Sequence, residues 1–184
     1  MRIISLFSIL ILSMPALAAE IAGVKVNDQI TLDGETLILN GAGIRSKFVV
    51  KVYVGSLYLA KKQGNPQAVI DADVKSRIGM QFLYSKVDKK KTVAAWNEGL
   101  EKNLDAATLA SLKPRIAEFN AMFPDLLEGD HVTLDYIPGK GTEVVINGVS
   151  KGVVKGADFN RAVKSIWLGK KPVTGDLKEA MLGQ

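Results

Sequence analysis

Short apolar runs separated by turn residues characterise the first part of the chain and predict β-strands. The longest run, KFVVKVYVGSLYLA at residues 47–60, is rich in valine and tyrosine. It predicts one long central strand that breaks or bulges at Gly55. The turn signal Leu32-Asp33-Gly34 separates two shorter runs. The strands predicted in this part cover residues 24–30, 35–40, 47–60 and 77–84.

Further along the chain, apolar residues recur at helical spacing. Asp88 is a candidate N-cap for the first of two successive helices. Asn147-Gly148 is a strong hairpin signal between two later strands. The predicted helices span residues 93–104, 109–123, 159–167 and 177–182, and the later strands span 131–138, 142–146 and 149–154. Because strands and helices come in blocks rather than in regular alternation, the pattern predicts one α+β domain with an antiparallel sheet.

Residues 1–18 have the pattern of a secretory signal peptide. A positive start at Arg2 precedes an apolar run, and Ala16-Leu17-Ala18 is an A-x-A cleavage pattern. The alternative is an uncleaved anchor, but the run is short for a membrane span and ends in small residues. We therefore expect cleavage after Ala18 and a periplasmic mature protein of residues 19–184, without an integral membrane span.

Composition excludes several kinds of chemistry. The 184 residues include no cysteine and one histidine, which excludes disulfides, thiolate metal sites, cysteine nucleophiles and multi-histidine metal clusters. We expect neither a metal nor a cofactor. The formal net charge of +5 favours anionic ligands or lipid headgroups. Basic residues do not interleave with aromatic ones, so nucleic acid is not an expected partner. The run Lys89-Lys90-Lys91 is typical of a solvated helix face.

Three local motifs are better explained without a function. Gly148-Val149-Ser150-Lys151-Gly152 matches the G-x-S-x-G elbow of serine hydrolases, but it lies between hairpin strands, and His131, the one histidine, precedes it. Gly139-Lys140-Gly141-Thr142 lacks the spacing and the following helix of a phosphate loop. Asp33 and Glu35 flank a turn glycine and are predicted to be a solvated pair.

Gly41-Ala42-Gly43-Ile44-Arg45 is a stronger candidate for function. The two glycines permit close backbone approach and place an arginine at the head of an apolar strand. A guanidinium is permanently charged and its planar fork suits carboxylates, phenolates and enolates. If Arg45 points inward, it needs an anionic partner. That partner is either a bound ligand or an acidic side chain of a structural salt bridge.

The same segment resembles a known family. LNGAGIRSKFVVKVYVGSLYLA (residues 39–60) is similar to the signature of the chalcone isomerase-like superfamily, and FNRAVKSIWLGKKPVTGDLKEAML (residues 159–182) resembles its C-terminal helices. The resemblance extends from about residue 21 to residue 184. It implies an open-faced sandwich, in which a layer of helices covers one side of a large antiparallel sheet.

The resemblance also implies two functions for Arg45. In plant chalcone isomerases, the matching arginine stabilises the phenolate and developing enolate. In fatty-acid-binding members, it holds a carboxylate together with a tyrosine. This chain has Tyr53 where the isomerases carry a threonine, as the fatty-acid-binding branch does, and Ile166 where they carry a second threonine. The loss of these polar groups argues against an isomerase.

Three hypotheses follow. The first is a non-catalytic exported protein that binds a small hydrophobic carboxylate, with Arg45 and Tyr53 at the head group. The second is an isomerase in which Arg45 is the catalytic residue, and the third is a ligand-free scaffold. Arg45 and Tyr53 are eight residues apart, so they share a ligand only if the chain bends between them; otherwise Tyr53 packs within the sheet. The predicted pocket lining is Val50, Val52, Phe82, Trp96, Ile166 and Trp167.

Overall fold

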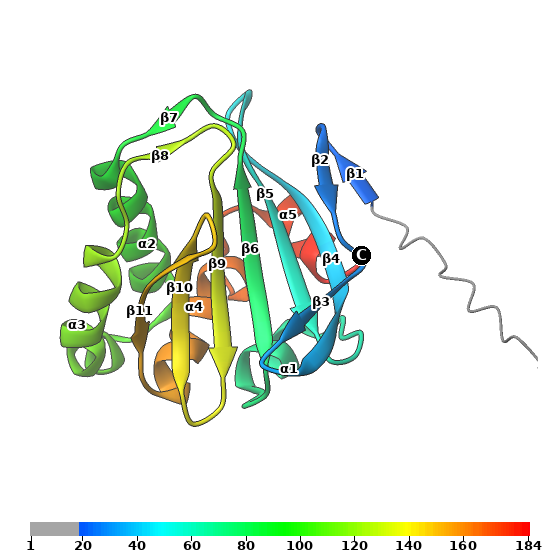
Figure 1. The fold of residues 1–184 in the computed structure, drawn as a ribbon. Coiled ribbons are helices and arrows are strands. Elements are labelled where there is room, and N and C mark those ends of the chain that lie inside the picture. The colour runs from blue at the N-terminus through cyan, green and yellow to red at the C-terminus, as the bar shows by residue number, and fades with distance from the viewer. Residues whose placement is uncertain (1–18) are drawn as a thin grey trace, which may run out of the picture.

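A computed structural model describes residues 19–184, and the predicted signal peptide, residues 1–18, lies outside the described residues. The main feature is a seven-stranded antiparallel sheet with the order β11-β10-β9-β6-β5-β4-β3 (Figure 1). Its strands are β3 (Gln29–Leu32), β4 (Glu35–Lys47), β5 (Val50–Leu59), β6 (Ser76–Phe82), β9 (His131–Ile137), β10 (Gly141–Ile146) and β11 (Val149–Val154). Two short pairs accompany it, β1 (Ala19–Ile21) with β2 (Val24–Val26) and β7 (Lys86–Val87) with β8 (Leu126–Leu127).

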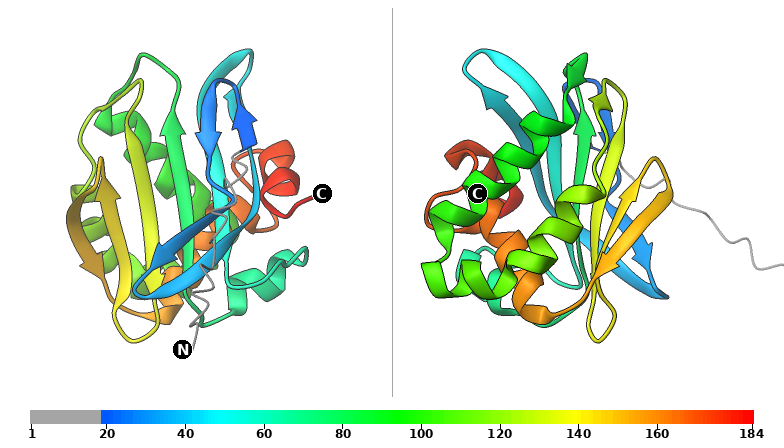
Figure 2. Two further views of the ribbon diagram at one scale, coloured as in Figure 1. Left: turned by 45° about the vertical axis from the view of Figure 1, so that its right-hand side comes forward. Right: turned by 90° about the vertical axis from the view of Figure 1, so that its left-hand side faces the viewer.

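Helices cover one face of this sheet (Figure 2). They are α1 (Pro66–Asp71), α2 (Lys89–Asn103), α3 (Ala106–Ala121), α4 (Ala157–Leu168) and α5 (Gly175–Met181). The main core lies between the two layers, and α4 is buried along most of its length. A second, smaller core on the opposite face includes Val26, Leu37 and Tyr58. The predicted α+β open-faced sandwich is confirmed.

The predicted strand at residues 47–60 is wrong in one respect, because the chain reverses direction within it. Lys47 pairs with Val50, so Phe48 and Val49 form a two-residue turn between β4 and β5. This turn contains none of the glycine, proline, asparagine or aspartate residues that mark turns. Gly55 lies inside β5, opposite Gly43, and the register shifts of this strand pair lie elsewhere.

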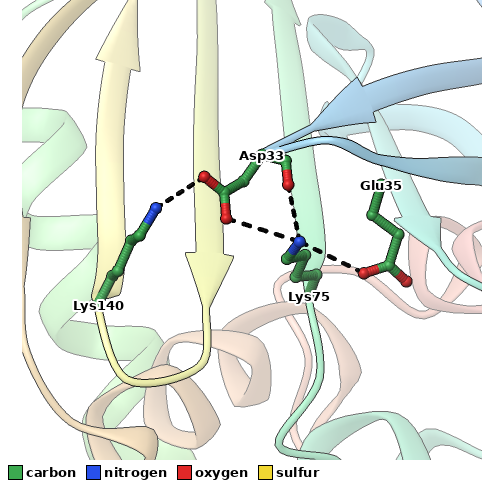
Figure 3. Close-up of polar contacts among 4 residues, drawn as sticks. All are labelled: Asp33, Glu35, Lys75 and Lys140. Carbon is green, nitrogen blue, oxygen red and sulfur yellow. Dashed lines mark hydrogen bonds and ion pairs between the residues drawn. The ribbon is translucent and has the colours of Figure 1, made fainter.

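The sheet is curled, and polar contacts connect its distant strands at one end (Figure 3). Asp33, in the β3–β4 turn, accepts a hydrogen bond of 2.7 Å from Lys140 in the β9–β10 turn. Lys75 Nζ lies 3.6 Å from Asp33 and 3.5 Å from Glu35. The hydrogen bond from Lys140 lowers the pKa of Asp33. Asp33 and Glu35 are therefore members of a surface ion-pair network rather than a simple solvated pair.

The two glycines before Arg45 allow α5 to pack directly on the backbone of β4. A Cβ atom at Gly41 would lie 2.0 Å from the carbonyl oxygen of Ala180, and one at Gly43 would lie 2.5 Å from Ala180 Cβ. Asn40 Nδ2 donates a hydrogen bond of 2.8 Å to the Met181 carbonyl at the same contact. The close approach expected from the glycine pattern is thus an approach of the C-terminal helix, which supports the strand that carries Arg45.

Lys164 on α4 is 1% exposed, and its Nζ donates hydrogen bonds of 3.1 Å to the carbonyls of Val69 and Ala72. Burial lowers the pKa of Lys164 from 10.5 to about 8. Between these two values the unfolded chain binds more protons than the folded one. We therefore expect the Lys164 contribution to raise the free energy of unfolding by up to about 1.4 kcal/mol per pH unit across this window.

Urea unfolding at successive pH values from 7 to 10 measures this effect, and Lys164→Met should remove the rise. Above about pH 10 the trend should reverse. Burial raises the pKa of both Tyr53 and Tyr136 to about 12, so the folded chain keeps protons that the unfolded chain releases. If the stability of Lys164→Met depended on pH in the same way as that of the wild type, the rise could not be attributed to Lys164.

Candidate ligand-binding site

A cavity of about 600 Å³ lies between the β4–β5 hairpin, the end of β6 and helix α2. This volume is within the usual range for small-molecule sites. Its apolar wall includes Val50, Val52, Phe82, Trp96 and Val173. Its polar lining includes Arg45, Ser46, Lys47, Lys86, Lys91, Thr92, Glu98, Lys102 and Lys171. An apolar interior with a mostly basic lining suits an amphiphile with a negative head group.

The hairpin brings Arg45 and Tyr53 together. The two residues are direct partners across the β4–β5 ladder, next to a register shift between Arg45 and Ser46. Arg45 Cζ lies 5.7 Å from the centre of the Tyr53 ring, and both residues line the cavity. The reversal at Phe48 and Val49 supplies the bend that a shared ligand requires.

Arg45 is half-buried and lines the cavity. Among the described residues, no carboxylate lies within salt-bridge distance of it. Glu98, the acidic residue of the cavity lining, is paired with Lys102. The hydrogen bond from Lys102 is the main cause of the lowered pKa of Glu98, and Arg45 adds a smaller effect. Arg45 therefore carries a charge that the surrounding side chains do not neutralise.

Tyr53 is fixed by a contact with α4. Its ring is 2% exposed, and its hydroxyl oxygen accepts a hydrogen bond of 2.9 Å from Trp167 Nε1. Burial raises the pKa of Tyr53 to about 12, so the phenol stays protonated at neutral pH. Within the described part of the chain, the hydroxyl hydrogen has no acceptor. Tyr53 can thus donate this hydrogen to a ligand.

Two of the predicted lining residues are not at the cavity. Val50, Val52, Phe82 and Trp96 line it, whereas Ile166 and Trp167 do not, and both are completely buried. Ile166 packs against α2 at Gly99, where a Cβ atom would lie 2.9 Å from Ile166 Cγ2. Ile166 and Trp167 lie away from this cavity because Gly99 of α2 and Tyr53 pack against them.

Comparison with known proteins identifies the family of this chain. The family model described as chalcone isomerase-like matches residues 18–183. This is a chalcone isomerase-like protein. Among solved structures, the fatty-acid binding protein AtFAP1 of Arabidopsis thaliana aligns with a TM-score of 0.68 and 18% sequence identity, over 87% of this chain and 92% of AtFAP1. A search of curated proteins found no match. The structural likeness supports the fold, and family membership is compatible with either an isomerase or a binding protein.

Two polar groups at the cavity of this chalcone isomerase-like protein were not predicted. Thr92 Oγ1 and Trp96 Nε1 are buried and have no hydrogen-bond partner among residues 19–184, although both residues line the cavity. A buried polar group without a partner costs about 1–3 kcal/mol. Thr92 and Trp96 are four residues apart on α2, so helical spacing from Trp96 is the signal that could have found Thr92. Lys91, from the predicted solvated face, also lines the cavity.

The motifs set aside above lie outside this cavity. Ser150 is in β11, which follows a hairpin turn at Asn147 and Gly148, so it is not at a strand-to-helix elbow. His131 begins β9 on the opposite face of the sheet from the main core. Over residues 19–184, no three acidic or histidine side chains are arranged to hold a metal ion. No helix within that range is long and apolar enough to cross a membrane.

Replacing Tyr53 with phenylalanine should affect both stability and binding. The variant leaves Trp167 Nε1 buried without its acceptor, so we expect the free energy of unfolding to fall by about 1–3 kcal/mol. It also removes the hydroxyl hydrogen that Tyr53 can donate to a ligand. Urea unfolding and calorimetric titration with a fatty acid measure the two effects. The double variant Tyr53→Phe/Trp167→Phe is the control for the lost hydrogen bond, and unchanged stability of the single variant would contradict this role.

Proposed function

We propose that this protein is a non-catalytic carrier or receptor for a small hydrophobic carboxylate of the fatty-acid class. The observation that carries the proposal is the unneutralised guanidinium of Arg45 at the wall of a largely apolar cavity. An arginine fork binds a carboxylate through two parallel hydrogen bonds. Tyr53 donates a third, and the aliphatic chain lies against Val52, Phe82 and Trp96. The fatty-acid-binding activity named for AtFAP1, which shares the fold, is consistent with this proposal.

Two observations make a ligand-free scaffold less favoured. A scaffold would pair Arg45 with an internal acid, but the described residues supply none at salt-bridge distance. A scaffold would also fill the space between the sheet and α2, where a cavity of about 600 Å³ is found. Both features fit a protein that binds a ligand there.

An isomerase is the second alternative, and the cavity gives it less support. Ile166, at the position of the second pocket threonine of the isomerases, is apolar and fully buried. We expect no chalcone turnover above background, measured as the loss of visible chalcone absorbance. Turnover that disappears in Arg45→Ala would instead establish the isomerase.

The proposal includes export to the periplasm, which depends on the first eighteen residues. Cleavage after Ala18 predicts a mature chain that begins at Ala19. N-terminal sequencing of the protein from a periplasmic extract tests this expectation. A chain that retains its leader would place the protein on a membrane anchor instead.

Native mass spectrometry of the mature protein tests the binding function directly. We expect a bound amphiphile at a stoichiometry of one, which extraction then identifies. A ligand that binds only the folded state at a hundredfold excess over its dissociation constant raises stability by about 2.7 kcal/mol. A free fatty acid should therefore raise the melting temperature, whereas its methyl ester should not, because the ester has no negative charge. Equal effects of acid and ester would contradict a head-group site at Arg45.

A further inference from the structure

The most exposed large apolar side chains of the described residues lie at the tip of the β4–β5 hairpin. Phe48 is 92% exposed and Val49 is 95% exposed, whereas the other exposed large hydrophobic side chains reach at most 56%. Figure 1 and Figure 2 show this hairpin protruding at one end of the sheet. The two side chains therefore contribute little to the core.

The backbone conformation of this turn also does not favour an aromatic residue at position 48. Phe48 has a φ of 54°, in the left-handed region that favours glycine or asparagine. Two-residue hairpin turns that need a positive φ generally use those residues. Neither turn chemistry nor burial accounts for Phe48, and such a local exception points to a role outside the fold.

Positive charges flank the apolar tip. Lys47 and Lys51 lie on either side of the turn and are exposed. In the part of the chain that is described, neither lysine has an acidic partner. Exposed apolar side chains flanked by free lysines are the combination that binds an anionic lipid interface.

The cavity opens at the same end of the molecule. Lys47, Phe48, Val50 and Tyr84 are exposed and also line the cavity, so its mouth lies beside the hairpin tip. A surface that rests on this tip would therefore face the opening.

We infer that this end of the protein docks on an anionic lipid bilayer. Phe48 and Val49 insert at the boundary between headgroups and acyl chains, and Lys47 and Lys51 contact the anionic headgroups. The cavity mouth then faces the bilayer, which is a store of amphiphiles. A protein partner is less favoured because a standard interface buries about 800 Å² on each partner, whereas this apolar tip consists of two protruding side chains. The docking does not depend on the identity of the cavity ligand.

Vesicle flotation tests this inference with the mature protein. We expect binding to vesicles of phosphatidylcholine mixed with phosphatidylglycerol, weaker binding to phosphatidylcholine alone, and loss of binding as salt rises well above about 0.1 M. Val49→Asp should weaken binding to the mixed vesicles at least about tenfold. Lys51→Ala should weaken it about fivefold. The matched control is Val74→Asp, since Val74 is 47% exposed near the opposite end of β6.

Phe48→Gly separates docking from a structural role. This variant relieves the positive φ of Phe48, so its melting temperature should not fall, while its vesicle binding should. A lower melting temperature with unchanged vesicle binding would overturn the inference. Equal vesicle binding of Val49→Asp and wild type would also overturn it.

The remaining outcomes distinguish docking from the function proposed above. Fatty-acid affinity in vesicle-free solution reports on the cavity alone, and Val49→Asp should keep it, because Val49 is not a lining residue. Fatty-acid binding without any vesicle binding would overturn docking and leave the proposed function standing. Vesicle binding without fatty-acid binding would support docking and overturn the proposed function. If sedimentation shows a dimer that Val49→Asp dissociates, and vesicles do not bind, the tip is an interface between two copies and docking is overturned.

Discussion

Arg45→Ala is expected to weaken fatty-acid binding by about 10- to 100-fold, because loss of a charged hydrogen-bonding group costs about 1.5–3 kcal/mol in total. The variant should remain folded. In the described residues Arg45 has no acidic partner, so its removal leaves no buried charge unpaired. Calorimetric titration with a fatty acid measures the affinity, and urea unfolding of the ligand-free protein measures the stability.

Arg161→Ala is the matched control, since Arg161 is exposed on α4 and does not line the cavity. Arg45→Lys should bind with intermediate affinity, because an ammonium group keeps the charge but lacks the planar fork. Unfolding of Arg45→Ala would identify a structural role for the arginine. Unchanged affinity would remove Arg45 from the binding site altogether.

Gly43→Ala should lower the free energy of unfolding by about 1–3 kcal/mol, the usual cost of overpacking. The added methyl group would lie 2.5 Å from Ala180 Cβ, where α5 packs on β4. Since β4 carries Arg45 two residues further along, a displaced strand should also weaken ligand binding. Urea unfolding measures the first effect and fatty-acid titration the second.

A second substitution tests the cause of that loss. Ala180→Gly removes the methyl group that Gly43→Ala would meet, so the double variant should recover most of the lost stability. A residual loss of about 1 kcal/mol is expected from glycine within a helix. Gly175→Ala is the control, because no atom lies within 4 Å of its added methyl group. Additive effects of the two substitutions would contradict direct contact between residues 43 and 180.

The positions of most strands and helices could be predicted from local patterns. The blocks of strands and helices predict an antiparallel α+β fold, and the Asn147-Gly148 signal predicts the hairpin between β10 and β11 correctly. The turn at Phe48 and Val49 could not be predicted, because its two apolar residues continue the strand pattern on both sides. Its position depends on the pairing of β4 with β5, which is a contact between strands.

The residues of the candidate site were likewise predictable from the sequence only in part. Arg45 stands out from its residue type and its place after two glycines, and the family resemblance adds Tyr53. Ile166 and Trp167 were predicted to line the pocket and do not line this cavity, because helical periodicity identifies a buried face without showing whether that face meets a cavity or another helix. Thr92 was missed because the predicted helix begins at residue 93, although its spacing of four residues from Trp96 places both on one face of α2.

The sequence by itself determined the fold class, the family and the arginine that carries the proposed function, because these depend on local periodicity, residue chemistry and a motif. Only the tertiary structure decided that Arg45 and Tyr53 are neighbours, that Arg45 has no acidic partner in the described chain, and that a cavity lies beside them. These features depend on which strands pair and on how closely α5 and α2 approach the sheet. Such distances result from packing between segments far apart in the chain, and local sequence patterns carry little information about them.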